Sequence, residues 1–310
     1  MLRDLSGEER ASYFRGIQPI WGGGLGEERF QLFQRRLADA AEAQGRYRLL
    51  GWFDKGGLTA AMKAYDLRGA CAGRPLRLLG IGAVFTPPAL RRRGYAAAML
   101  RAAMDEYRRA GAHAAILFSD IDVRYYERLG FHTLESRECT VDAGGLPRTA
   151  GPFRQAVAGD EGSMTRLFEA GRERGGRFSL VRDGWPLRFQ LRRLRELARS
   201  RAMGEPEWGM VVEGRSGDGA AMIRFGRDSV DVLDAGWTSD AARESLLGAL
   251  RDCLHRTGRL RVRFWPAGQL RALVPESERS AAIAMLAPLD DTAPLPGRGA
   301  PTELALLDHI

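Results

Sequence analysis

The chain has 310 residues and carries 47 Lys and Arg against 39 Asp and Glu, a formal charge of +8. This length accommodates about two domains of ordinary size, because a domain typically has ~100–150 residues. With 45% apolar and 28% charged residues, the composition excludes wholesale disorder. No apolar run reaches the ~18 residues that a transmembrane helix needs, and the charged start MLRDLSGEER lacks the apolar core of a secretory signal.

The positive charge is carried almost wholly by arginine. Lys55 and Lys63 are the only lysines, and the arginines are spread along the chain. Scattered charge of this kind is typical of a solvated surface, so we predict neither a nucleic-acid partner nor a membrane partner. The three cysteines lie far apart, and neither they nor the four histidines have metal-ligand spacing. We therefore expect a reduced, cytoplasmic protein without disulfides and without a bound metal.

The first 85 residues predict helices followed by an antiparallel meander. Phe30, Phe33 and Leu37 form the apolar stripe of an amphipathic helix within residues 1–46. The strand-like runs that follow, separated by glycine-containing turns, are residues 47–53, 58–67 and 76–85.

A helix, a buried strand and a short helix complete the first half. The first helix is expected over residues 96–110, with Gly111 as its left-handed cap, and the strand over residues 114–118. A short helix follows at residues 121–129, and Ser119 or Asp120 can supply its N-cap. The segment Thr149-Ala150-Gly151-Pro152 is the best candidate for a domain boundary.

The second half repeats part of this order. The expected helices are residues 159–174, 186–199 and 240–255. The expected strands are residues 208–213, 220–225, 230–233, 260–265 and 282–287. We therefore predict an α/β fold (α+β, with mixed sheets) built from two copies of one architecture, residues 1–148 and 149–290. An exposed linker and a tail are expected over residues 291–310.

The most informative chemistry lies where the strand ending at residue 85 gives way to a helix. The first amides of a helix have no internal partner and carry the positive end of the helix dipole. Gly94 and Ala96 allow a phosphate to approach the backbone, and Arg91, Arg92 and Arg93 supply charge. These residues predict a pyrophosphate cradle. Their spacing matches neither the P-loop nor the dinucleotide fingerprint, which disfavours a nucleoside triphosphatase and a dehydrogenase.

The run Arg91-x-x-Gly94-x-Ala96 resembles the acetyl-CoA pyrophosphate motif of the GNAT superfamily of acyl-CoA-dependent N-acetyltransferases. A second segment, from Tyr125-Tyr126 to Gly130-Phe131, resembles another motif of that superfamily and follows at the family's distance. The resemblance covers residues 1–140 and implies an acetyltransferase with acetyl-CoA as co-substrate. The second copy has neither motif, which implies two tandem GNAT-like domains of which the second is degenerate.

The resemblance assigns roles position by position. Tyr126 matches the tyrosine near the thioester sulfur, where a phenol can donate a proton or a hydrogen bond to the departing thiolate, and Tyr125 is expected to pack. Val84, Phe85 and Thr86 match the strand that pairs with the pantetheine arm. The other coenzyme-binding candidates are Arg91, Arg92, Arg93, Gly94, Tyr95, Ala96 and Ser119, the last with helix capping as its alternative role.

The tandem layout also resembles the enhanced-intracellular-survival (Eis) group of multi-acetylating aminoglycoside N-acetyltransferases. That group has a third, sterol-carrier-like domain, which has no counterpart here, and it uses its chain-end carboxylate as general base. By this resemblance, the Ile310 carboxylate is a candidate base, with Asp308 and His309 as neighbouring candidates. The alternative is a tail that only packs against the protein.

The implied acceptor is a small-molecule primary amine, aminoglycoside-like or of another kind, that attacks the thioester directly and binds between the two domains. One alternative is a non-catalytic acyl-CoA-binding regulator with the same fold. Another is a nucleic-acid-binding module, although no basic face with interleaved aromatics is evident. Acetylation of small thiol precursors stays open, as does a homo-oligomer.

Overall fold

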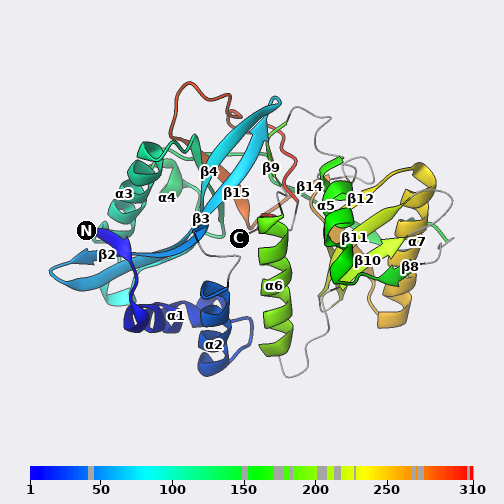
Figure 1. Ribbon diagram of the computed structural model, residues 1–310, viewed down its shortest axis with the longest axis horizontal. Helices are drawn as coiled ribbons and strands as arrows, with labels where there is room; N and C mark the ends of the chain where they lie inside the picture. The colour runs from blue at the N-terminus through cyan, green and yellow to red at the C-terminus, as the bar shows by residue number, and fades with distance from the viewer. Residues whose placement is uncertain are drawn as a thin grey trace.

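The computed structural model describes residues 1–310 except for residues 41–44, 149–152, 171–176, 182–183, 201–207, 213–217, 227, 267–269, 271–275, 306–307 and 310. The boundary segment expected at residues 149–152 and the candidate base Ile310 therefore lie outside the described residues. The described strands form two sheets side by side, one of eight strands and one of seven (Figure 1).

The first sheet has the order β1-β2-β3-β4-β5-β15-β6, and β9 pairs with β3. Its strands are β1 (Leu2–Asp4), β2 (Tyr47–Asp54), β3 (Gly57–Cys71), β4 (Arg74–Phe85), β5 (Ala114–Ser119), β6 (His132–Thr133), β9 (Ser179–Leu180) and β15 (Ile283–Pro288). Its helices are α1 (Gly7–Trp21), α2 (Glu27–Ala38), α3 (Tyr95–Arg109) and α4 (Arg124–Glu127). We call this sheet with these helices the first unit. The meander β2-β3-β4 is antiparallel, whereas β4 and β5 are parallel, because α3 crosses between them.

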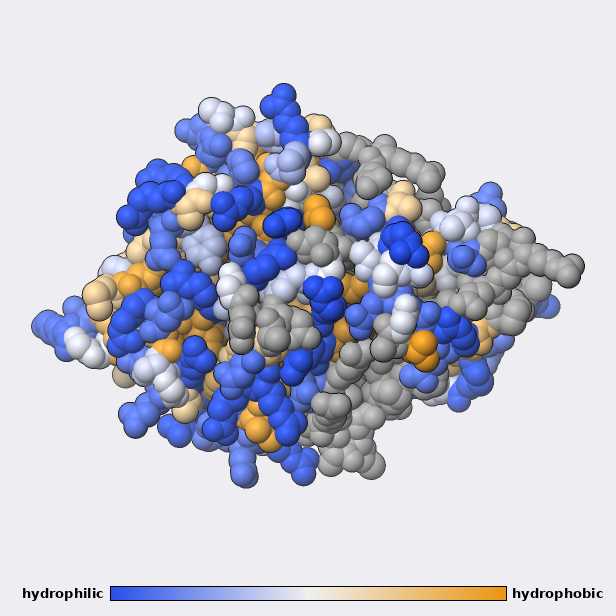
Figure 2. All heavy atoms as spheres, viewed as in Figure 1, coloured by the Kyte–Doolittle hydropathy of each residue, from blue (hydrophilic) through white to orange (hydrophobic). Residues whose placement is uncertain are grey.

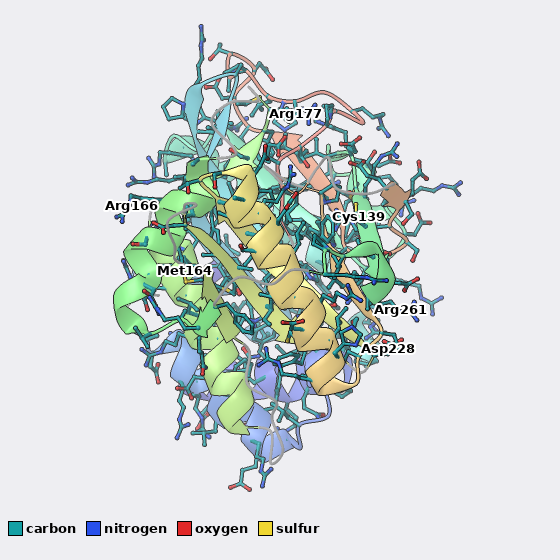
Figure 3. All side chains as sticks on the ribbon, turned by 90° about the vertical axis from the view of Figure 1, so that its right-hand side faces the viewer. Cys139, Met164, Arg166, Arg177, Asp228 and Arg261 are labelled. Carbon is teal, nitrogen blue, oxygen red and sulfur yellow. The ribbon has the colours of Figure 1, made fainter. Side chains whose placement is uncertain are left out.

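The second sheet has the order β14-β7-β13-β12-β11-β10-β8. Its strands are β7 (Arg137–Asp142), β8 (Phe153–Gln155), β10 (Trp208–Val212), β11 (Gly219–Phe225), β12 (Ser229–Trp237), β13 (Arg261–Phe264) and β14 (Glu276–Glu278). With α5 (Glu161–Ala170) and α7 (Asp240–Thr257) it forms the second unit, and Figure 3 shows α7 lying across this sheet. Here β12, α7 and β13 repeat the parallel strand–helix–strand arrangement of β4, α3 and β5. The prediction of an α/β fold with mixed sheets is confirmed.

The two halves of the chain exchange strands, and one helix packs against both sheets. Strand β15, from the end of the chain, lies between β5 and β6 of the first sheet, and β7, from the first half, lies between β13 and β14 of the second. Helix α6 (Trp185–Ser200) stands between the sheets (Figure 1). It gives Trp185 and Phe189 to the core under α1 and α2, and Leu187 to the core under α5. The predicted boundaries at 148/149 and 290/291 therefore do not separate the two sheets.

Each sheet is covered by helices on both faces. In the first unit, one apolar core lies between the sheet and α1 and α2, and another lies between the sheet and α3 and α4. Figure 2 shows that hydrophobic residues form only small separate patches among hydrophilic ones on the face it displays. Among the described residues, no helix combines the length and the hydrophobicity that crossing a membrane requires.

The C-terminal segment is bound to the rest of the protein, unlike the exposed linker that the sequence predicts. The amide of Gly299 donates to the Thr133 carbonyl at 2.8 Å, and that of Glu303 donates to the Phe178 carbonyl at 2.8 Å. The Glu303 carboxylate also forms an ion pair with Arg177, labelled in Figure 3, at 3.2 Å. These bonds hold the last described residues against the first unit.

The strand exchange predicts that residues 1–148 do not fold alone. This fragment lacks β15, so β5 and β6 lose the strand that joins them, and β7 has no sheet to enter. We expect no cooperative thermal transition for the fragment by circular dichroism, and a cooperative transition for the full chain. As a control, residues 279–305 joined to the fragment through a flexible linker should restore a transition. A fragment that melts cooperatively without β15 would contradict this dependence.

Candidate active site

The candidate site begins with a bulge near the end of β4. Ala61 of β3 pairs with Phe85 and Lys63 pairs with Gly82, so one β3 residue faces two residues of β4. One of these two, Ala83, has a positive φ of 46°, and the Tyr13 hydroxyl of α1 donates to its carbonyl at 2.7 Å. Helix α1 therefore holds the bulge in place.

A gap between β4 and β5 opens just beyond this point. The last parallel pair is Ile81 with Leu117, and none of the described β5 residues pairs with residues 82–86. Strand β5 instead continues along β15, where Ser119 pairs with Ile283. The backbone of residues 82–86 therefore has no strand partner on its β5 side, which leaves it able to pair with an extended ligand.

The start of α3 follows β4 after a connection that contains the short helical turn Pro88–Leu90, and it has no side-chain cap. Gly94 is its N-cap in the left-handed conformation (φ 82°), and Arg92 also has a positive φ of 62°. Ala98 donates the first backbone bond of the helix, to the Gly94 carbonyl at 2.9 Å, so the three preceding amides have no partner within the helix. Arg91 donates to the Thr86 carbonyl at 3.2 Å, which ties the turn to the end of β4. The predicted cradle is thus an exposed, uncapped helix start beside the gap.

The matching helix of the second unit starts differently. Ser239 caps α7, because its hydroxyl oxygen accepts from the Ala242 amide at 3.1 Å. Asp240 places a carboxylate in the first turn and pairs with Arg243 at 3.0 Å. This end already holds an acceptor oxygen and a negative charge of its own, so a phosphate is disfavoured there.

Tyr126 lies in the apolar core that also contains Leu117 and, at its edge, Val84. Its side chain is buried on α4, with the Tyr125 ring 5.0 Å and the Phe131 ring 5.9 Å away. No described residue forms a hydrogen bond with its hydroxyl. Burial, with smaller effects of Tyr125 and Asp120, raises the pKa of Tyr126 to about 12, so the phenol keeps its proton at neutral pH.

The predicted cap of α4 is wrong. The helix begins at Arg124, whose amide donates to Asp122 at 3.0 Å, and neither Ser119 nor Asp120 caps it. The buried Ser119 hydroxyl donates to the Ile121 carbonyl at 2.9 Å, and Asp120 accepts from the Ala282 amide at 2.9 Å. The Ser119 hydroxyl is thus committed to its own turn, and its role as a coenzyme contact stays a prediction.

The end of the chain reaches β5 on the face of the sheet opposite the core that holds Tyr126. The His309 ring lies 5.5 Å from that of Phe118 and 5.9 Å from that of Trp265. Asp308 is buried, and its carboxylate accepts from the Ala305 amide at 2.8 Å. Of the three tail candidates, His309 therefore lies near the end of β5, Asp308 is bound within its own turn, and Ile310 lies outside the described residues.

Sequence reasoning missed Lys63, a buried lysine on β3. Its Nζ donates to Gln34 of α2 at 2.9 Å, and burial, with a smaller effect of Arg193, lowers the pKa of its ammonium group to about 7. The signal was available: period-two alternation places Lys63 on the same strand face as Tyr65 and Leu67. The described residues contain no group of three or more His, Cys, Asp and Glu side chains arranged to hold a metal ion.

With this geometry in view, residues 10–134 match the family profile of the acetyltransferase (GNAT) domain. The matched residues lie in the first half of the chain, and they include the bulge of β4 and the start of α3. A domain of this family transfers an acyl group from acyl-CoA to an acceptor, and the predicted enzyme class, an N-acetyltransferase of the GNAT type, is confirmed. Among curated proteins, none matches this sequence.

Solved structures share the fold over nearly the whole chain. A GCN5-related N-acetyltransferase from Kribbella flavida is 18% identical with a TM-score of 0.68, and the match covers 92% of this chain and 70% of that one. Eis1 from Mycobacterium abscessus is 19% identical with a TM-score of 0.56, and the match covers 94% of this chain and 73% of Eis1. A tandem GNAT protein from the clavulanic acid biosynthesis pathway is 11% identical with a TM-score of 0.54, and the match covers 94% of this chain and 99% of that protein. These identities establish the fold alone, and they confirm two tandem GNAT-like units.

Gly16 of α1 packs against the Phe85 ring of β4 so closely that a side chain at this position has no room. A Cβ on Gly16 would lie 2.5 Å from the Phe85 ring, so Gly16→Ala must displace either that ring or the helix. We expect a loss of about 1–3 kcal/mol of unfolding free energy, measured by denaturant titration. Gly7→Ala is the matched control in the same helix, because nothing lies within 4 Å of its added Cβ. Equal stability of the two variants would contradict this contact.

Proposed function

We propose that the first unit transfers an acetyl group from acetyl-CoA to the primary amine of a small molecule. The observation that carries the proposal is the uncapped start of α3, which follows the bulged end of β4 and lies beside the gap between β4 and β5. Acetyl-CoA combines an anionic pyrophosphate with an extended arm and a thioester, and the residues present fit all three parts. A cytoplasmic location fits as well, since none of the three cysteines forms a disulfide in the described part of the chain.

The coenzyme roles follow from these positions. The amides of Arg92, Arg93, Gly94, Tyr95 and Ala96 hold the pyrophosphate, with added charge from Arg91. The exposed helix dipole favours this anion, and Gly94 leaves open space because nothing lies within 4 Å of where its Cβ would be. Val84, Phe85 and Thr86 present the unpaired edge of β4 to the pantetheine arm. Ser119 stands at the end of β5 on the other side of the gap.

Tyr126 serves the departing thiolate. Bound acetyl-CoA supplies a thioester that a neutral amine can attack directly. A protonated phenol beside the sulfur donates a hydrogen bond as negative charge develops there, and then passes on its proton as general acid. The pKa of about 12 is supportive, because Tyr126 retains this proton throughout the range in which amines become neutral. The surrounding apolar core strengthens the interaction by excluding water.

The amine proton needs an acceptor, for which we propose the chain-end carboxylate of Ile310. The support is the position of the preceding residue, since His309 packs on Phe118 at the end of β5. His309 is a weaker candidate, because burial and nearby arginines lower its pKa to about 4. Asp308 is also weaker, because its carboxylate already accepts from the Ala305 amide.

Gly94→Glu tests the cradle. The substitution places a negative charge and a strained left-handed residue at the start of α3, so we expect acetyl-CoA to bind roughly tenfold or more weakly by titration calorimetry. Gly111→Glu is the matched control, because Gly111 has φ 83° at the far end of the same helix. Equal affinities in these two variants would count against the cradle.

Tyr126→Phe tests the acid. We expect kcat to fall by roughly 100-fold or more, with the heat of acetyl-CoA binding unchanged, in an assay of free thiol release against a panel of amines. Tyr125→Phe is the control, since the two rings pack together and only Tyr126 is assigned to the sulfur. If the wild type binds acetyl-CoA but acetylates no amine, and Tyr126→Phe changes nothing, the non-catalytic regulator is the better reading.

Small changes at the chain end test the base. Deleting residues 304–310 would remove the buried Leu304 and Ala305, so it would confound catalysis with stability. We propose to delete Ile310 alone and, separately, to append two glycines, both of which move the carboxylate. Each change should lower kcat roughly tenfold or more and shift the acidic limb of the pH–rate profile, without altering the melting temperature. Unchanged turnover in both proteins would exclude Ile310 as the base.

A further inference from the structure

Arg279 is a buried arginine without a hydrogen-bond partner for its side chain. It follows β14, is 8% exposed, and both its Nε and Nη1 are buried and unpaired among the described residues. Although burial lowers the pKa of the guanidinium to about 10, the group is charged at neutral pH. An unpaired buried charge is destabilising, so this position favours an anion that the described residues do not supply by a hydrogen bond.

Trp265 holds the guanidinium in a fixed orientation. The Arg279 Cζ atom lies 3.5 Å from the centroid of the Trp265 ring. Stacking of this kind leaves the N–H groups in the guanidinium plane, where they can form a two-pronged contact with a carboxylate. Beside the guanidinium is a cavity of about 10 Å³, lined also by Glu135, Arg137, Pro266, Thr302 and Leu304, and the Glu135 carboxylate there is paired with Arg137 at 3.3 Å. This is room for about one oxygen-sized group, which suits a carboxylate oxygen better than a phosphate.

Two contacts bring Arg279 to the end of β5. The Ala282 amide, three residues on, donates to Asp120 at 2.9 Å, and Asp120 directly follows Ser119. The Trp265 ring also lies 5.7 Å from the Phe118 ring. Phe118 packs at the edge of the core on the α1 face of the sheet, opposite the core that holds Tyr126. Arg279 is therefore near the reacting end of the gap, on the face away from the phenol.

Charges of both signs lie near Arg279. For the neighbouring His309, burial lowers the pKa most, Arg193, Arg279 and Arg224 also lower it, and Asp120 partly offsets them. Glu135 lines the same cavity but pairs with Arg137, and Glu138 raises the pKa of Arg279 without forming a hydrogen bond with it. The unpaired Arg279 guanidinium itself repels a second cation brought to this position.

The nearby buried carboxylate of the second unit is already committed. Asp231 is 2% exposed and accepts from Arg224 at 2.7 Å, from Arg263 at 3.0 Å and from Ser229 at 3.1 Å. It is committed to its own arginines, and none of its printed partners is Arg279.

We infer that the acceptor is an amine that also carries a carboxylate, and that Arg279 binds this carboxylate at the junction of the two units. The inference rests on the proposed function, and it names the substrate class of that site. Arg279 anchors the acid end, which leaves the amine free to approach the thioester from the α1 face of β5. The same guanidinium disfavours a polycationic aminoglycoside, which brings no anion to Arg279.

The experiment compares acids with their own amides. The full chain is assayed with acetyl-CoA and the ω-amino acids from 4-aminobutanoate to 6-aminohexanoate, each beside the amide of the same length. Thiol release gives kcat/KM, and calorimetry on the CoA-saturated protein gives affinity. At one chain length or more, the acid should exceed its amide by roughly tenfold or more in both measurements.

Variants then assign the preference to Arg279. Arg279→Met should abolish the preference for acids while leaving kcat/KM for the amides unchanged, and Arg279→Lys should retain part of it. Arg137→Met is the matched control, because Arg137 lines the same cavity but pairs with Glu135 at 3.3 Å and Glu276 at 3.7 Å. It should keep the full preference. Melting temperatures establish which variants are folded, and the wild-type comparison of acid with amide needs none of them.

The outcomes separate this inference from the proposed function. If amines are acetylated but acids never exceed amides, the inference is overturned and the proposed function stands. If no amine is acetylated, the proposed function fails, while Arg279-dependent binding of the acids would still support a carboxylate site and its absence would overturn that too. If acetate alone binds as tightly as the amino acids, the site serves a free anion and the acceptor assignment is overturned.

Discussion

The candidate site depends on one constraint: the parallel ladder between β4 and β5 ends at the pair Ile81–Leu117. Up to that pair the two strands satisfy each other's backbone groups, and beyond it they part, because β4 bulges toward α1 while β5 follows β15. The bulge persists because Tyr13 donates to the Ala83 carbonyl and because Gly16 admits the Phe85 ring. A gap with a free backbone edge is costly in an interior, so it is stable only where surrounding packing enforces it and a ligand can use it.

The second unit shows which part of this arrangement makes a coenzyme site. Strand β12 also has a register shift, near Asp234, and its parallel ladder with β13 also ends, at Val232–Phe264. What differs is the helix start, where Ser239 and Asp240 occupy the positive end of α7 with their own oxygens. The bulge and the split are thus shared features of the architecture, and in the proposed coenzyme site it is the N-cap of the helix that distinguishes the two units.

The sequence predicted the local features well, because they depend on local chemistry. The meander, α3 and the turn at Arg91–Gly94 all follow from periodicity or glycine placement. The burial of Tyr126 comes from the structure, and its role at the thioester stays a prediction. The sequence could not predict that β15 enters the first sheet and β7 the second. The apolar run of β15 fits any sheet with an open position, and β7 is short and half polar, so neither pattern names a partner strand. The roles of Arg279 and Trp265 depend on that exchange, because the loop before β15 reaches Asp120 only when β15 lies beside β5.

Strand exchange also changes how the charge of the protein bears on its substrate. A net charge of +8 spread over a surface says little about an acceptor, because salt screens exposed charges beyond about 10 Å. A buried charge is screened much less. Arg279 has little water around it, so its charge acts strongly on a ligand that binds beside it. Most arginines here are solvated or paired, as the bond from Arg137 to Glu135 illustrates, and they impose no demand on a ligand. The one buried guanidinium that the described residues leave unpaired lies where the chain end, β5 and the second sheet meet. In our proposal, local desolvation, not total charge, therefore selects the acceptor.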